Sequence, residues 1–298
     1  MGLAAAMMLA VSCSPKKEAQ KVLVLYYSQT SNTKAVAEEI AKKLNADIEE
    51  VVPTTPYNGD FQATIERSMK EREEGKVPEI KPLAADVTKY DVIFIGYPIW
   101  FGTYAPPIAA LLDQIDLSGK KVVPFCTFGS GGLESSVKDL AAKQPKAEIL
   151  EGYGVRAARL KAMPEEVDQF LKANGFIEGE YTKLEPFPEQ HEVTDEEAAI
   201  FDAAVGNYPM MNAKATKVAS RTIPDGTEYL FTAVDQPRED KPNMPPPGNM
   251  KPGKDKPNMP PPGNMKPGDK PQMPPPGEMK VYVTVAKGEA PVFTKVIR

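Results

Sequence analysis

The segment from Val22 to Lys34 constrains the fold of this chain more than any other. Its first part, Val22 to Tyr27, is apolar without alternation, which is typical of a strand buried on both faces. A short polar turn comes next, Ser28-Gln29-Thr30-Ser31-Asn32-Thr33. Apolar residues then recur at helical spacing, at Ala35, Val36, Ile40, Ala41 and Leu44. The segment therefore predicts a buried strand that passes through a polar turn into a helix.

This turn is a candidate phosphate site, because the start of a helix offers unpaired N–H groups and a partial positive charge. It contains neither a glycine nor a Walker Gly-Lys-Ser/Thr pattern. Uncharged hydroxyl groups would therefore bind the ligand, which suits one phosphate monoester better than a polyphosphate with its metal. A capped helix after a buried strand, without any ligand, explains the same residues.

The composition narrows the classes of function. The 298 residues are enough for two modest domains, and the net charge of −5 does not suggest a nucleic-acid partner. One histidine, His191, and two cysteines, Cys13 and Cys126, argue against a disulfide framework and a His/Cys metal site. We therefore expect no metal, and we expect Cys126 to be a buried strand residue.

The N-terminus resembles a bacterial lipoprotein signal. An apolar run, Met1 to Ser12, ends in small residues before a cysteine, and Ala10-Val11-Ser12-Cys13 reads as a lipobox. The resemblance implies that residues 1–20 are a signal and a polar tether, that Cys13 is lipidated, and that the protein is lipid-anchored in the bacterial cell envelope. The run is too short to span a bilayer. A short buried helix with a free thiol is the alternative.

Residues 21–179 alternate between predicted strands and helices. The strands after the first are Ala46–Val52, Val92–Gly96, Lys121–Thr127 and an extended segment within Glu148–Leu160. The helices after the first are expected at 60–75, 107–115 and 133–143, and from Pro164 to just before Gly175. This alternation predicts a doubly wound, five-stranded parallel α/β sheet, whose ligands bind beyond the carboxyl ends of the strands.

Two further loops lie at strand ends. Tyr97–Thr103 carries Trp100, the only tryptophan, which could stack on a planar aromatic ligand. Phe128–Gly132 is nearly free of side chains, so that its backbone could approach the edge of a ring. Together with the polar turn, these loops describe a site for flavin mononucleotide, FMN. Packing of Trp100 against the chain's own helices or a second domain is the alternative.

The sequences S-Q-T-S-N-T after V-L-V-L-Y-Y and G-Y-P-I-W-F-G resemble those of the flavodoxin family, over residues 22–176. The resemblance implies FMN as the cofactor. The residues implied at its phosphate are Ser28, Thr30, Ser31, Asn32 and Thr33. Those implied at the isoalloxazine ring are Pro98, Ile99, Trp100, Phe101 and Gly102, with Thr127, Phe128, Gly129 and Ser130 on the other flank. The Pro56-Tyr57-Asn58-Gly59 sequence is interpreted as a plain turn, with cover for the flavin as the alternative.

A second domain is predicted at 194–298, after a linker at 180–193. Thr194 to Glu197 is a capping box that opens a helix. Strands are expected at 214–222, 227–234, 280–286 and 291–297, which gives one helix and a four-stranded antiparallel sheet. The hairpin at Asp225-Gly226-Thr227-Glu228-Tyr229 resembles that of the cystatin family. The inhibitory Q-x-V-x-G motif reads T-I-P-D-G here, so we expect a docking or spacing role and no protease inhibition.

Residues 237–280 hold three copies of a proline-rich repeat, which cannot form a core and predicts a disordered arm. Six methionines in it could bind Cu(I), whereas an expanded spacer repeat explains them without a metal. They are Met244, Met250, Met259, Met265, Met273 and Met279.

The leading hypothesis is a membrane-tethered flavodoxin-like protein that binds FMN. It would carry electrons to a redox partner protein or reduce a small electron acceptor. The alternative is a non-enzymatic envelope binding protein whose flavodoxin-like domain has lost its flavin. The hydroxyl groups of Ser28, Thr30 and Thr33 favour the first reading, because a domain without a phosphate ligand has no need of them.

Overall fold

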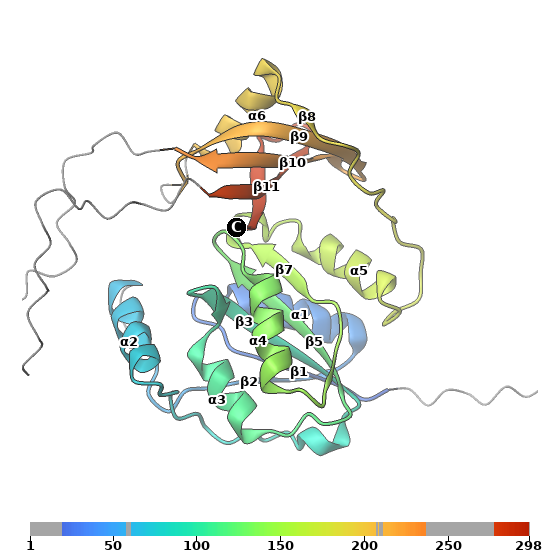
Figure 1. The fold of residues 1–298 in the computed structure, drawn as a ribbon. Helices are drawn as coiled ribbons and strands as arrows, with labels where there is room; N and C mark the ends of the chain where they lie inside the picture. Colours follow the sequence, from blue (N-terminus) through green and yellow to red (C-terminus); the bar gives the residue numbers. More distant parts are fainter. Residues whose placement is uncertain (1–19, 58–60, 207, 209–210, 237–276, 298) are drawn as a thin grey trace, which may run out of the picture.

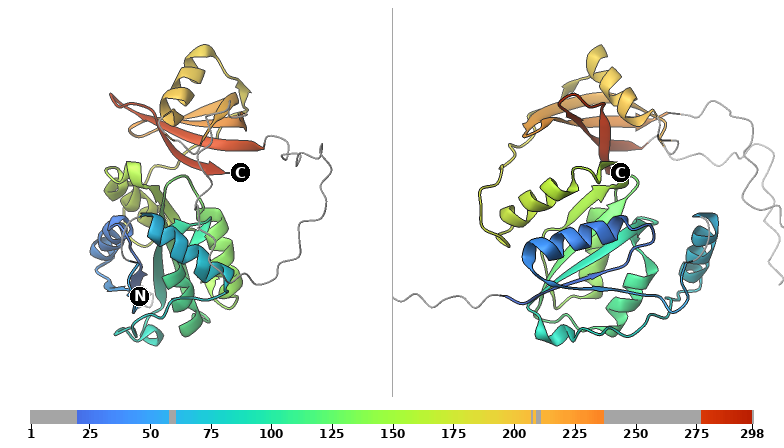
Figure 2. Two further views of the ribbon diagram at one scale, coloured as in Figure 1. Left: turned by 90° about the vertical axis from the view of Figure 1, so that its left-hand side faces the viewer. Right: turned by 180° about the vertical axis from the view of Figure 1, so that it is seen from behind.

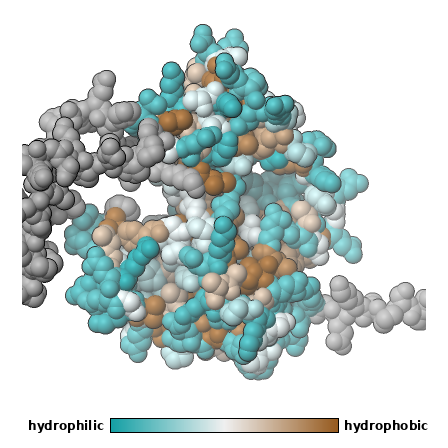
Figure 3. All heavy atoms as spheres, in the orientation of Figure 1, coloured by the Kyte–Doolittle hydropathy of each residue, from teal (hydrophilic) through white to brown (hydrophobic). Residues whose placement is uncertain are grey.

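The computed structural model describes residues 20–57, 61–206, 208, 211–236 and 277–297. They form a parallel α/β domain followed by an antiparallel sheet with one helix (Figures 1 and 2). Cys13 and the proline-rich residues 237–276 lie outside these ranges. Nowhere in the described ranges is there a helix with the length and apolar character needed to cross a membrane. The face drawn in Figure 3 is largely hydrophilic over both domains.

The first domain is organised around a parallel sheet with the order β2-β1-β3-β5-β6. Its parallel strands are β1 Val22–Tyr26, β2 Asp47–Glu50, β3 Val92–Trp100, β5 Lys121–Phe128, β6 Glu148–Ile149 and β7 Tyr153–Arg156. The short β4, Thr103–Tyr104, pairs with β3 in the antiparallel direction. Both β6 and β7 pair with β5 in parallel, so they share the fifth position of the sheet. The predicted five-stranded, doubly wound sheet is confirmed.

Helices on both faces cover this sheet: α1 Asn32–Leu44, α3 Pro106–Gln114, α4 Leu133–Lys143 and α5 Met163–Ala173. Helix α2, Phe61–Glu73, stands beside the sheet (Figure 1). Two short 3-10 helices, η1 Val87–Lys89 and η2 Ala157–Arg159, lie in the connections. Ile40 of α1 and Val167 of α5 belong to the core on one face, together with Val24 of β1. Leu111 of α3 and Leu140 of α4 belong to the core on the other face. Because both faces are covered, the central strands must be apolar throughout.

The predicted second loop is a β-hairpin, which corrects the sequence interpretation. Strand β3 continues past Gly96 to Trp100, and the chain returns as β4. Phe101 and Gly102 form the turn with φ angles of 51° and 82°, the left-handed pair that tight hairpins require. Pro98 does not end the strand, because the pairing of β3 with β1 stops at Gly96. The missing N–H of this proline therefore costs no bond to β1.

The second domain is an antiparallel sheet with the order β12-β11-β10-β9-β8. Its elements are β8 His191–Glu192, α6 Asp195–Val205, β9 Ala213–Ile223, β10 Gly226–Asp235, β11 Glu278–Ala286 and β12 Val292–Ile297. The capping box at Thr194 and Glu197 is confirmed. Phe201 of α6 packs with Phe231 and Phe293 in the core between helix and sheet.

Two details of this domain differ from the sequence interpretation. The short β8 adds a fifth strand at the edge, because His191 and Glu192 pair with β9. Strand β11 begins at Glu278, so the predicted disordered insert ends too late. Met279 is 1% exposed in the core and cannot serve as a surface ligand for copper. The other five methionines of the repeat lie outside the described residues.

Gly96 tests the packing of the central sheet. An added Cβ would lie 2.1 Å from Cζ of Phe125. We expect Gly96→Ala to lower the free energy of unfolding by about 1–3 kcal/mol, because the core has no room for the methyl group. Urea unfolding measures the change. The double variant with Phe125→Leu should be more stable than Gly96→Ala alone, since the smaller side chain frees space. A Gly96→Ala protein as stable as the parent would contradict this account of the packing.

Candidate functional site

The polar turn between β1 and α1 presents unpartnered backbone donors. Ser31, the residue before the helix, has φ 65° and makes no side-chain capping bond. No described residue accepts a hydrogen bond from the backbone N–H groups of residues 30–33. The first turn of α1 also carries no acidic side chain. The turn therefore combines free donors with a positive helix end, the arrangement that binds a phosphate.

Some hydroxyl groups of this turn have a hydrogen-bond partner among the described residues, and others have none. Thr33 and Thr127 are 1% and 4% exposed, and their Oγ1 atoms lie 2.8 Å apart. Ser28 Oγ accepts a hydrogen bond of 3.2 Å from the Lys34 N–H. Thr30 and Ser31 are exposed and lack such side-chain bonds to other described residues. The exposed pair is thus the more available to a ligand, while the threonine pair joins the first loop to the end of β5.

Trp100 lies beside the first loop, within a cluster of aromatic rings. Its ring meets Tyr27 edge-on at a centroid distance of 5.9 Å and Tyr57 at 5.2 Å. Gln29 fixes this cluster, because its side chain accepts a bond from the Tyr27 hydroxyl and donates to the Tyr57 carbonyl. Trp100 remains half-buried, and Phe101 at the tip of the hairpin is 46% exposed. The ring of Trp100 thus packs on two tyrosines rather than on the helices.

Tyr57 belongs to this site more closely than its interpretation as a plain turn suggested. It is buried, its hydroxyl donates to Glu71 at 2.5 Å, and the Arg67 guanidinium lies 3.9 Å from the centre of its ring. Burial, with the nearby Glu71 carboxylate, raises the pKa of Tyr57 well above its usual range. The signal in the sequence is an aromatic residue in a turn, which is unusual unless it packs against something. Helix α2 thus supports the Trp100 hairpin from one side.

The third loop adjoins the hairpin. An added Cβ at Gly132 would lie 2.6 Å from Cγ2 of Ile99, and Ser135 Oγ donates to the Gly102 carbonyl at 2.5 Å. The three predicted loops therefore meet at one edge of the sheet. Gly129 and Ser130 bond through their carbonyl groups to Arg156 and to the C-terminal domain.

Two neighbouring residues are part of the core. Phe128 is buried, and its ring closely approaches Gly154 of β7, so it is not a free aromatic face. Cys126 is fully buried, as expected, and burial raises the pKa of its thiol well above its usual range. Neither side chain is available to react at the surface.

The residues present fit a phosphate-bearing planar ligand. The turn supplies uncharged donors, Trp100 supplies an aromatic wall, and the glycine-rich loop supplies a rim without bulk. The hydroxyl of Thr103, next to the turn of the hairpin, is buried without a partner among the described residues. A buried hydroxyl group normally has a hydrogen-bond partner, and no described residue supplies one for this hydroxyl.

Ligand-binding loops at the carboxyl edge of a doubly wound sheet define the class of α/β nucleotide- and flavin-binding folds. The flavodoxin family model matches residues 21–169, half of the 298 residues. The chain belongs to the flavodoxin family.

Several known proteins share part of this chain. An NAD(P)H dehydrogenase (quinone) of Cupriavidus metallidurans is 35% identical over 101 residues, which are 32% of this chain and 46% of the relative. One of Azorhizobium caulinodans is 33% identical over 133 residues, 39% of this chain and 62% of the relative. The chain thus spans about half the length of these curated relatives.

Two solved structures are also similar. One from Bacteroides eggerthii is 29% identical, covers 52% of this chain and 97% of its own, and has a TM-score of 0.47. A flavoprotein of Lactobacillus acidophilus in complex with FMN is 29% identical and has a TM-score of 0.43. The match covers 46% of this chain and 93% of the flavoprotein.

The buried threonine pair gives a test of the site's framework. Thr33→Val should lower the free energy of unfolding by about 1–3 kcal/mol, because the Thr127 hydroxyl loses its partner in the interior. Chemical denaturation measures it. Thr33→Ser keeps a hydroxyl and should stay close to the parent. The double variant Thr33→Val with Thr127→Val should recover most of the loss, and a double variant less stable than the single one would refute the pairing.

Proposed function

We propose that the N-terminal domain binds FMN and acts in electron transfer. The observation that carries this proposal is the run of N–H groups at residues 30–33 that have no partner among the described residues, at a helix start without acidic side chains and near Trp100. Membership of the flavodoxin family supports FMN as the ligand. Uncharged donors stabilise a single phosphate group without needing a metal.

In this proposal, each part of the site has its own task. Thr30, Ser31 and Asn32 bind the phosphate through their backbone N–H groups and hydroxyl or amide side chains. The Trp100 hairpin lies along the ring and shields it from water. When bound, FMN supplies the redox chemistry, since the protein contributes binding, orientation and electrostatics.

The names of the curated relatives favour reduction of a small acceptor over transfer to a partner protein. Both are NAD(P)H dehydrogenases (quinone), although this chain matches only part of each. We propose a quinone as the first acceptor to assay, with NADH or NADPH as donor. Reduction of the bound flavin without turnover of any quinone would instead indicate an electron carrier.

The phosphate turn can be tested with one exposed residue. Thr30→Asp places a negative charge next to the proposed phosphate, so we expect FMN affinity to fall by at least about tenfold. Riboflavin lacks the phosphate, and its affinity should change by less than about twofold. Titration followed by quenching of flavin fluorescence measures both. Thr30→Asn, a neutral change at the same position, is the control.

A different result would favour the alternative function. If the purified parent is colourless and quenches neither FMN nor riboflavin fluorescence, the domain has lost its flavin. The protein would then be a binding protein of the cell envelope. Equal losses of both ligands in Thr30→Asp would mean that the turn does not bind the phosphate.

We also propose that the protein is anchored in the cell envelope by a lipid on Cys13. The support is the Ala10-Val11-Ser12-Cys13 sequence and the polar segment that follows it. A cysteine-linked lipid holds a domain at the membrane without a spanning helix.

Fractionation of bacterial cells tests the anchor. The parent should sediment with membranes and require detergent for release, whereas Cys13→Ser should appear in the soluble fraction because it cannot be acylated. Incorporation of a labelled fatty acid should disappear in the same variant. Ser14→Ala, the adjacent residue, should behave as the parent. Membrane association that survives Cys13→Ser would exclude this anchor.

A further inference from the structure

The C-terminal domain makes direct contact with the third loop of the proposed flavin site. Strand β12 is the edge of its sheet, and the outward N–H of Val296 donates to the Ser130 carbonyl at 2.6 Å. An added Cβ at Gly131 would lie 2.5 Å from the Val296 carbonyl oxygen, so the two backbones pack without side chains between them. Lys295 pairs with Glu134 of α4 at 2.7 Å. Figure 1 shows β12 reaching down to this end of the parallel sheet.

Arg156, the last residue of β7, joins the two domains through backbone and ring contacts. Its Nε donates to the Gly129 carbonyl at 2.7 Å and its Nη1 to the Phe293 carbonyl at 3.3 Å. The guanidinium also lies 3.6 Å from the centre of the Phe293 ring and 5.5 Å from that of Tyr208. No carboxylate among the described residues forms an ion pair with it. The side chain is therefore placed to hold backbone carbonyls and aromatic faces rather than to balance a charge.

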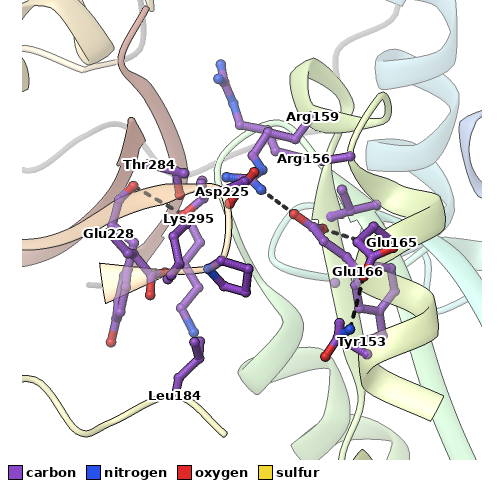
Figure 4. Close-up of a pocket in the computed structure, with 18 of the residues that line it drawn as sticks. Tyr153, Arg156, Arg159, Glu165, Glu166, Leu184, Asp225, Glu228, Thr284 and Lys295 are labelled. Carbon is purple, nitrogen blue, oxygen red and sulfur yellow. Dashed lines mark hydrogen bonds and ion pairs between the residues drawn. The ribbon is translucent and has the colours of Figure 1, made fainter. Parts of the chain in front are cut away.

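A cavity of about 460 Å³ separates the domains beside this contact (Figure 4). Two ion pairs lie at its wall, Arg159 with Glu166 and Arg221 with Glu228. Because this cavity lies between the domains, they do not pack continuously here. Arg156 and β12 therefore form a localised contact centred on residues 129–131.

We propose that the C-terminal domain is a fixed part of the flavin site, with Arg156 as a positioning residue for the third loop. This inference rests on the proposed binding of FMN. A loop rich in glycine loses much conformational freedom when it is ordered. Arg156 and Val296 order residues 129–131 before the ligand binds, so that binding of FMN does not include the loss of conformational entropy of this loop. The domain therefore raises affinity for the flavin through a loop that it holds, without itself touching the ring.

The test uses the full chain and compares Arg156→Met with Lys161→Met. Lys161 pairs with Glu289 of the C-terminal domain at 3.1 Å, yet it does not contact the third loop. Both variants thus remove a cation between the domains, and only one removes a bond to Gly129. Two readouts are needed: amide hydrogen exchange at residues 130–132 without FMN, and the affinity and visible circular dichroism of bound FMN.

We expect Arg156→Met to speed hydrogen exchange at these amides, to lower the affinity for FMN by about fivefold or more, and to alter the circular dichroism of the bound flavin. Arg156→Lys should recover part of each effect, because an ammonium can bond one of the two carbonyls. Lys161→Met should leave all three unchanged. Faster hydrogen exchange in Arg156→Met with unaltered FMN affinity and dichroism would overturn the inference, because ordering of the loop would then not affect flavin binding.

A second variant covers the case in which Arg156→Met fails to fold. Val296→Pro removes the N–H that bonds to Ser130 and replaces a side chain that packs against the core of the C-terminal domain, and an edge strand tolerates proline. It should give the same direction in every readout, and parent-like values would contradict the proposal. If the parent binds no FMN at all, the proposed function fails, while hydrogen exchange still reports whether the docked domain orders the loop.

Discussion

The burial of β1 and β3 on both faces is the constraint on which the rest of the structure depends. Two adjacent parallel strands covered by helices must be apolar along their length, and the polar turn after β1 and the aromatic hairpin at the end of β3 lie at the same edge of the sheet. The 2.8 Å contact between the hydroxyl groups of Thr33 and Thr127 ties the first of these loops to the end of β5. The site is therefore a product of strand order rather than of any one motif.

The sequence predicted this framework well, because its signals are local. Apolar runs predicted the strands β1, β3 and β5. Helical spacing predicted α1 and α4, and the bounds of these two helices were nearly correct. The capping box at Thr194 likewise depends on residues within one turn of a helix. Periodicity and capping chemistry are enough to place such elements.

The details of the site depended on contacts that no local pattern reveals. The Phe101–Gly102 turn requires a phenylalanine with positive φ, which is uncommon and is imposed here by the return of β4 along β3. Tyr57 packs on Trp100, with its hydroxyl bonded to Glu71 of α2 and its carbonyl to Gln29. Met279 looked like part of the repeat, whereas pairing with β10 places it in the core. For Tyr57 and Met279, a partner distant in the sequence determined the outcome.

The hydrogen bond between Val296 and Ser130 joins residues that lie far apart in the chain. During synthesis the flavodoxin-like domain leaves the ribosome long before β12 has been made. The third loop cannot reach its final conformation until β12 has been synthesised, although the sheet beneath it can already form. Maturation of the third loop is thereby linked to the synthesis of β12, and a chain that stops before this strand would carry the sheet without this bond.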